Sequence, residues 1–142
     1  MPNWCSNRLK VIGPTEIVNV LTEDLKTPET SFSFNKVIPM PEDQEENWYD
    51  WRIEHWGIKW DIDCQYMYIL GIYTKTTHLE YKFDTPWGPP TEGIIALSKM
   101  NPSLIFYLSF AEPGMGFAGT QRIAGGEMVW HRSENKNIAS LF

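Results

Sequence analysis

Several features that would assign this chain of 142 residues to a familiar class are scarce or missing. No run approaches the roughly eighteen consecutive apolar residues of a membrane-spanning helix. The start, MPNWCSNRLK, lacks the apolar region of a signal peptide. The sequence also lacks a P-loop, a GxSxG elbow, an HExxH motif and a Gly-rich dinucleotide-binding loop. We therefore expect a cytoplasmic protein, and we predict that it is not an enzyme.

Cysteine and histidine are also rare. The two cysteines, Cys5 and Cys64, lie far apart and could form one disulfide, but their lack of partners at ligand spacing favours buried free thiols. A zinc site needs four nitrogen, sulfur or oxygen ligands, and His55, His78 and His131 lie on different predicted elements. We expect no metal and no cofactor.

Basic residues are outnumbered by acidic ones in a single segment, residues 37–63, while the rest of the chain is balanced in charge. The formal net charge of the chain is −6, and residues 37–63 hold eight acidic and two basic residues, so this segment carries all of it. A field of this sign repels phosphate backbones and speeds encounters with basic surfaces. It disfavours nonspecific nucleic-acid binding and favours a basic protein partner. The alternative is that these charges only keep an exposed loop and helix solvated.

The first half of the chain predicts a strand, a helix, a second short strand and a further helix. Residues 4–13 alternate as a strand does, and Thr15 is placed to cap a helix that runs to about residue 26. In SFSFNKVIPMP, phenylalanines alternate with serines, which predicts a short strand before the prolines. Residues 44–56 predict a helix that ends at Gly57.

The second half predicts mainly strands. Ile58, Trp60 and Ile62 alternate with charged residues, which indicates a strand with one buried face. YMYILGIY and HLEYKFD predict two strands joined by the TKTT turn, and LIFYLSF predicts a central strand. Between them, EGIIALSKM predicts a helix capped by Thr91. Two further strands should flank a Gly-Gly turn, and Ile138, Leu141 and Phe142 should pack back onto the body.

This order predicts one α+β domain over residues 1–142. Without the extra helix and hairpins it gives a βαββαβ frame, which is that of a ferredoxin-like sandwich with an antiparallel sheet. The fold would then carry an inserted Trp-rich helix and an extra C-terminal hairpin.

Four stretches also resemble a known family. MPNWCSNRLKVIGP, FSFNKVIPMP, WGIKWD and FDTPWGPP occur in the order found in the YubB-type family of bacteriophage and plasmid proteins, over residues 1 to about 110. The resemblance implies a ferredoxin-like fold and a role on mobile genetic elements. It implies no established activity and no catalytic residues. Because mobile elements carry many small proteins that act on the host, inhibition of a host defence system is our leading hypothesis, by association only.

The tryptophans need separate interpretations. Trp4, Trp60 and Trp130 fall on predicted strands and are expected in the core, and Trp87 should form a corner that holds the second helix to the sheet. The predicted helix over residues 44–56 places three more tryptophans near its one buried face. These rings are either a satellite core or anchors for a partner.

The candidate protein-binding site combines those rings with the carboxylates around them. Its residues are Glu42, Asp43, Glu45, Glu46, Trp48, Asp50, Trp51, Glu54 and Trp56. The first four carboxylates could hold a divalent ion, but their adjacency and exposure favour solvation. The expected partner is a host or phage protein with a basic surface.

Two alternatives remain open from the sequence. The exposed sheet face could bind single-stranded nucleic acid through stacked aromatics, because charge outside residues 37–63 is balanced. An enzyme with an unfamiliar site would depend on His55 or His131. Membrane association is not expected, and the sequence does not indicate an oligomeric state.

Overall fold

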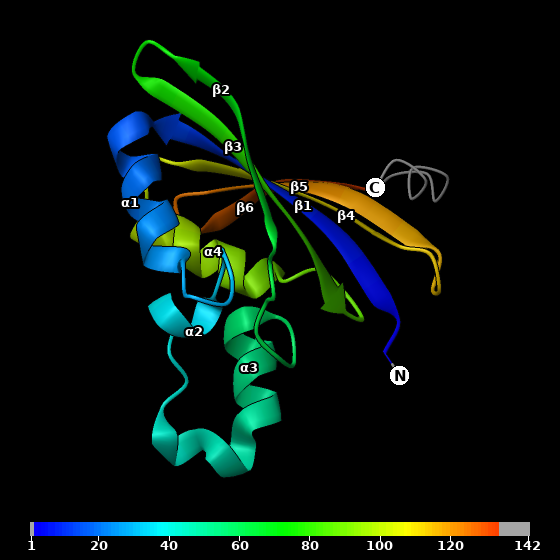
Figure 1. Cartoon of the computed structure of the whole chain (residues 1–142). Coiled ribbons are helices and arrows are strands. Elements are labelled where there is room, and N and C mark those ends of the chain that lie inside the picture. Colours follow the sequence, from blue (N-terminus) through cyan, green and yellow to red (C-terminus); the bar gives the residue numbers. More distant parts are fainter. Residues whose placement is uncertain (1, 134–142) are drawn as a thin grey trace.

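Six strands form one antiparallel sheet in the order β2-β3-β1-β4-β5-β6, in a computed structural model that describes residues 2–133 (Figure 1). The strands are β1 (Trp4–Pro14), β2 (Tyr66–Tyr73), β3 (Thr76–Pro86), β4 (Ile105–Glu112), β5 (Phe117–Ala124) and β6 (Glu127–Ser133). Strands β1 and β4 occupy the middle of the sheet, so the predicted central position of LIFYLSF is confirmed.

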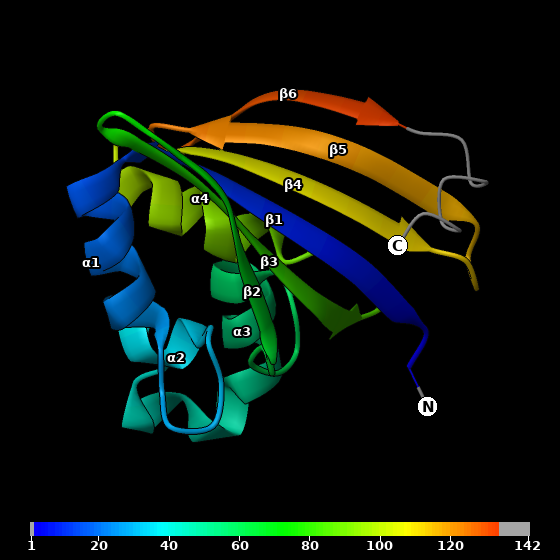
Figure 2. The same cartoon turned by 45° about the horizontal axis from the view of Figure 1, so that its top comes forward.

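The helices cover one face of this sheet, as Figure 2 shows. They are α1 (Thr15–Leu25), α2 (Phe34–Val37), the 3₁₀ helix η1 (Glu42–Asn47), α3 (Trp48–Trp56) and α4 (Thr91–Met100). Strand β1, α1, the β2–β3 hairpin, α4 and β4 form the βαββαβ frame of a ferredoxin-like fold. The predicted fold class is confirmed, with α2, η1 and α3 inserted before β2 and the β5–β6 hairpin added at the end.

Alternation along the central strands decides which side chains enter the core. In β1, Cys5, Asn7, Leu9 and Val11 are buried against the helices, and the residues that alternate with them face the other side of the sheet. In β3, the predicted inward set of Leu79, Tyr81 and Phe83 is buried in the same way. The sheet therefore has one helix-covered face and one open face.

The predicted caps of the two longer helices are wrong. Pro14 and Pro90 are the capping residues, and neither helix has a side-chain cap. The Thr15 hydroxyl lies 2.8 Å from that of Thr77, and the Thr91 hydroxyl donates to Gln121 Oε1 at 2.9 Å. Both threonines bond to side chains of the sheet rather than to their own helices.

Two predicted strands are absent from the described residues. The SFSF stretch leads into α2, and residues 58–62 join α3 to β2 without pairing to a strand. Ile58 and Ile62 are nevertheless buried. The alternation at 58–62 correctly indicated one buried side, but a period of two does not specify a hydrogen-bonded neighbour.

The predicted core positions of three tryptophans are also wrong. Trp4 is 44% exposed and Trp130 is 39% exposed, while Trp60 is half-buried. Trp4 precedes the buried Cys5, so the alternation of β1 turns it to the open face. Trp130 is on the edge strand β6, opposite Arg122 of β5.

Trp87 forms a corner, but one that differs from the prediction. Its φ is 71°, its side chain is exposed, and its backbone N–H donates to the Asn3 carbonyl at 2.7 Å. The corner therefore links the end of β3 to the residues before β1.

The cysteines are buried free thiols, as predicted. Burial, together with the nearby Glu112 carboxylate, raises the pKa of Cys5 to about 12. Burial also raises the pKa of Cys64 to about 11, although its thiol donates to two backbone carbonyls. Both thiols stay protonated at neutral pH, which makes them poor nucleophiles.

Residues 2–133 hold no group of three or more His, Cys, Asp or Glu side chains placed to bind a metal ion. Within the same range, no helix has both the length and the apolar character needed to cross a membrane. The predicted packing of Ile138, Leu141 and Phe142 lies outside the described residues.

Candidate binding surfaces

The predicted acidic residues form an exposed surface at one end of the molecule. Figure 1 shows η1 and the start of α3 projecting beyond α1 and α4, away from the sheet. All six carboxylates of the predicted site are exposed: Glu42, Asp43, Glu45, Glu46, Asp50 and Glu54. No residue of η1 is buried, so these charges stay hydrated and accessible.

The three tryptophans of α3 fall into different environments. Trp56 is 1% exposed, its indole N–H donates to the Ile38 carbonyl at 3.0 Å, and its ring lies 6.1 Å from that of Phe34. Trp51 is half-buried and stacks on His55 at 4.1 Å. Trp48 is 41% exposed. The cluster is therefore part core and part surface, and Trp56 must be removed from the predicted binding residues because no partner can reach it.

A small groove lies beside α3 where sequence reasoning placed no site. Its volume is about 260 Å³, and its walls include Tyr49, Ile53, Lys59 and Trp87. Tyr49, Ile53 and Trp87 are exposed apolar side chains. Tyr49 and Ile53 are four residues apart on one helix, which puts both on the same side of it. This spacing is the sequence signal that could have identified them as groove residues. The contribution of Trp87 depends on the fold.

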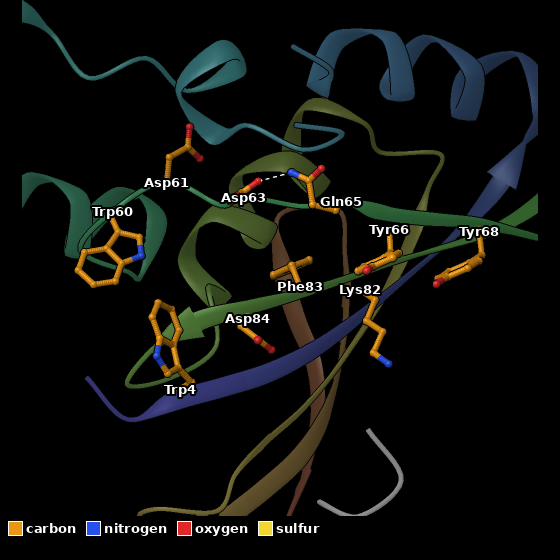
Figure 3. Close-up of a pocket in the computed structure, with 10 residues that line it drawn as sticks. All are labelled: Trp4, Trp60, Asp61, Asp63, Gln65, Tyr66, Tyr68, Lys82, Phe83 and Asp84. Carbon is orange, nitrogen blue, oxygen red and sulfur yellow. Dashed lines mark hydrogen bonds between the residues drawn. The ribbon is translucent and has the colours of Figure 1, made fainter. Parts of the chain in front are cut away.

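A larger pocket of about 620 Å³ opens at the side of the sheet (Figure 3). Trp4, Trp60, Tyr66 and Tyr68 supply its aromatic walls, and their source in three separate segments explains why the sequence did not predict it. The rings of Trp4 and Trp60 are 5.8 Å apart, and Lys59 Nζ is 4.8 Å from the Trp60 ring centre.

Two of the three carboxylates that line this pocket, Asp61 and Asp63, already have structural partners. Asp61 Oδ2 accepts from the Ser33 hydroxyl at 2.7 Å, and Asp61 Oδ1 accepts from the Phe34 N–H at 2.8 Å. Asp63 accepts from the Gln65 amide at 2.5 Å, a hydrogen bond drawn in Figure 3. These bonds make Asp61 a part of the fold and weaken the case for a metal in the pocket.

The two histidines of the enzyme alternative lie apart. His55 Nδ1–H donates to the Trp51 carbonyl of its own helix at 2.8 Å. His131 accepts from the Gln121 amide at 3.2 Å at the edge of the sheet. Each ring is oriented by a structural hydrogen bond, and neither is paired with the other.

The sheet order and the helices on one face define a ferredoxin-like α+β protein. The model of a family described as having a "ferredoxin-like domain in Api92-like protein" matches residues 55–139, more than half of the chain. The chain belongs to this family. The match includes WGIKWD and FDTPWGPP but not the two stretches that precede them, and it includes the C-terminal hairpin.

A relative that is similar in sequence supports this assignment. "Uncharacterized protein YubB" of Escherichia coli (strain K12) is 32% identical over 82 residues, which is 57% of this chain and 54% of that protein. The match thus spans about half the length of that relative. These findings confirm the resemblance to YubB-type proteins, and neither the family description nor this name refers to an enzymatic activity.

The crystal structure of the protein api92 from Yersinia pseudotuberculosis has the same fold. It covers 95% of this chain and 99% of its own, with a TM-score of 0.64 and 11% sequence identity. At that identity the likeness shows the fold alone.

Proposed function

We propose that this protein acts by binding a basic surface of a host or phage protein through the segment from η1 to α3, without catalysing a reaction. The observation that carries the proposal is the exposed groove beside α3, next to a segment that holds the whole net charge of the chain. Apolar anchors within a charged rim are the usual composition of a protein-binding hot spot.

The anchors differ from those that the sequence suggested. Tyr49, Ile53 and Trp87 line the groove, and Trp48 is exposed nearby on the same helix. Asp50 and Glu54, each one residue further along α3, are exposed beside Tyr49 and Ile53. A partner segment with an apolar side chain flanked by arginine or lysine would match this pattern, since the carboxylates would favour encounter and the groove would hold the apolar group.

The biological setting is part of the same proposal. The YubB-type resemblance suggests an accessory protein of a bacteriophage or plasmid, which we expect to act in the cytoplasm. Inhibition of a host defence system is a role that needs only binding. The exposed aromatic groups and the absence of a paired catalytic histidine among residues 2–133 support a binding role over a chemical one.

Affinity capture from host lysate treated with nuclease tests this proposal. In the acidic-site variant, Glu42, Asp43, Glu45 and Glu46 are changed to serine. The matched control changes Glu16, Glu23, Asp24 and Glu29 to serine, four exposed carboxylates on or near α1 with the same effect on net charge. The partner should be captured by the wild type and by the control, and lost with the acidic-site variant.

A further double variant separates the effect of the apolar anchors from that of the charges. Tyr49→Ala with Ile53→Ala removes one wall of the groove and leaves every carboxylate, so it should also weaken capture of the same protein. Equal capture by the acidic-site variant and the wild type would contradict the proposal, as would equal losses in the acidic-site variant and its control.

A further inference from the structure

The open face of the sheet forms a second exposed surface, which includes no residue of the segment 42–56. All the helices lie on the opposite face (Figure 2). The pairing of the strands places residues that are far apart in sequence next to one another on this face, because directly paired residues of adjacent strands point to the same side. Two rows of such residues cross the whole sheet.

The first row runs from β2 to β6 through the pairs Tyr66–Lys82, Lys82–Arg8, Arg8–Ser109, Ser109–Thr120 and Thr120–Arg132. The second row, two residues along each strand, runs through Tyr68–Glu80, Glu80–Lys10, Lys10–Tyr107, Tyr107–Arg122 and Arg122–Trp130. Both rows belong to the open face, since in β1 and β3 the residues of the rows alternate with the buried residues that face the helices.

These rows are basic, although the chain is acidic. They contain five lysines and arginines and a single carboxylate, that of Glu80. Asp84 follows in the next row, opposite Ser6. Arg8 and Arg132 take part in other interactions, so the argument depends on Lys10, Lys82 and Arg122. A band of positive charge on an acidic protein gives a local site for an anion that the total charge conceals.

Aromatic rings lie at the β2 end of both rows and at the β6 end of the second row. Tyr66 is 58% exposed and Tyr68 is 46% exposed, and their rings are parallel within 2° at a separation of 6.4 Å. At the other end, the exposed Trp130 lies 6.4 Å from Tyr107, and the Arg122 guanidinium is 5.7 Å from the Tyr107 ring centre. Figure 3 shows Tyr66 and Tyr68 beside Lys82 on the same side of the sheet.

We propose that these two rows bind single-stranded nucleic acid across the open face of the sheet. Lysine and arginine neutralise the phosphates, and the exposed rings stack on unpaired bases, a combination that does not depend on sequence. A single strand fits better than a duplex because a broad sheet cannot enter a duplex groove, whereas splayed bases can lie flat on the rings. An acidic protein, as an alternative partner, would pair with the lysines and arginines, but it would give the exposed aromatic rings no role in binding.

This site is independent of the proposed protein-binding surface, since the rows and residues 42–56 have no residue in common. The probe is a labelled oligothymidine or oligouridine of about 12 nucleotides, near the site size of known single-strand binders. Fluorescence anisotropy at about 50 mM salt and above would give both the affinity and its salt dependence. Wild-type protein should bind both probes, and more tightly than a duplex of the same length.

Two variants test the two kinds of contact. Lys10→Gln with Lys82→Gln should lower affinity by about tenfold or more, and should reduce the slope of log K against log salt by about 1.4, that is about 0.7 for each lost phosphate contact. Tyr66→Ala with Tyr68→Ala should lower affinity by about tenfold. The matched control, Lys26→Gln with Lys99→Gln, removes two exposed lysines from the helical side and should change affinity by less than about twofold.

Three outcomes would overturn this proposal. The first is no binding of either probe by the wild type at low salt. The second is an equal loss of affinity in the lysine variant and its control, which would indicate nonspecific attraction. The third is an unchanged affinity in the tyrosine variant with equal binding of duplex or heparin, which would make the face a general anion surface.

Discussion

The Asp61 carboxylate accepts a hydrogen bond from the backbone N–H of Phe34 at 2.8 Å, which ties the start of α2 to the segment that leads into β2. The same carboxylate accepts from the Ser33 hydroxyl and from the N–H of Asn35. A helix as short as α2 gains little from its own hydrogen bonds, so a cap supplied from a distant segment stabilises it. This arrangement also places Phe34 in the core, against Phe32 and Trp56.

Removing this cap should destabilise the fold. Asp61→Ala should lower the free energy of unfolding by about 2–3 kcal/mol, because several donors lose a charged acceptor at once. Urea denaturation followed by tryptophan fluorescence measures the change. Asp63→Ala is the matched control, since Asp63 is exposed and its carboxylate accepts a hydrogen bond from the nearby Gln65 side chain. A similar loss in both variants would argue against a specific capping role for Asp61.

Gly93 should not tolerate alanine, although it lies within helix α4. Alanine is favoured over glycine in a helix by about 1 kcal/mol, but a Cβ at Gly93 would lie no farther than 2.8 Å from three ring atoms of the buried Phe34. We expect Gly93→Ala to lower the free energy of unfolding by about 1–3 kcal/mol. Gly88→Ala is the control, because a Cβ there meets no atom within 4 Å. A stabilised Gly93→Ala protein would show that Phe34 can move aside.

Trp56 and Trp48 should differ in their effects on stability. Trp56→Ala empties a core site and leaves the Ile38 carbonyl without its indole donor, so a loss of about 3–5 kcal/mol is expected. Trp48→Ala should cost less than about 1 kcal/mol, since its ring is exposed. Thermal and urea unfolding of the two variants measure this difference. Comparable losses would contradict the division of the tryptophans into core and surface.

Stability should fall in alkaline solution. Burial raises the pKa of Cys5 to about 12 and that of Cys64 to about 11, from 9.0 in each case. Above pH 9 the unfolded thiols lose protons that the folded thiols retain, so the unfolded state is favoured as pH rises from about 9 to about 11. Each thiol adds a slope of up to about 1.4 kcal/mol per pH unit. The buried Tyr81, whose pKa is also raised, acts in the same direction.

Urea unfolding at pH 8 and at pH 10 tests this expectation. The wild type should lose stability between the two values, and Cys64→Ala should lose less, because one of the titrating groups is gone. An identical pH dependence in the wild type and in Cys64→Ala would mean that Cys64 does not contribute.

The sequence alone determined most of the fold. Alternation in residues 4–13 and 78–84, and the apolar run at 104–110, specify strands because a pleated strand turns successive side chains to opposite faces. The order of strands and helices then leaves few topologies, and the ferredoxin-like frame is one of them. A count of charged residues along the sequence also identifies residues 37–63 as the acidic segment.

Only the tertiary structure decided which side chains are available for binding. Periodicity could not show that Trp56 is buried under α2 while Trp48 is exposed, or that Asp61 caps a helix begun at Phe34, because both depend on segments that meet through folding. Nor could a count of charges along the chain reveal the basic rows of the open face. Lys10, Lys82 and Arg122 are far apart in sequence, and strand pairing brings them onto the same face of the sheet.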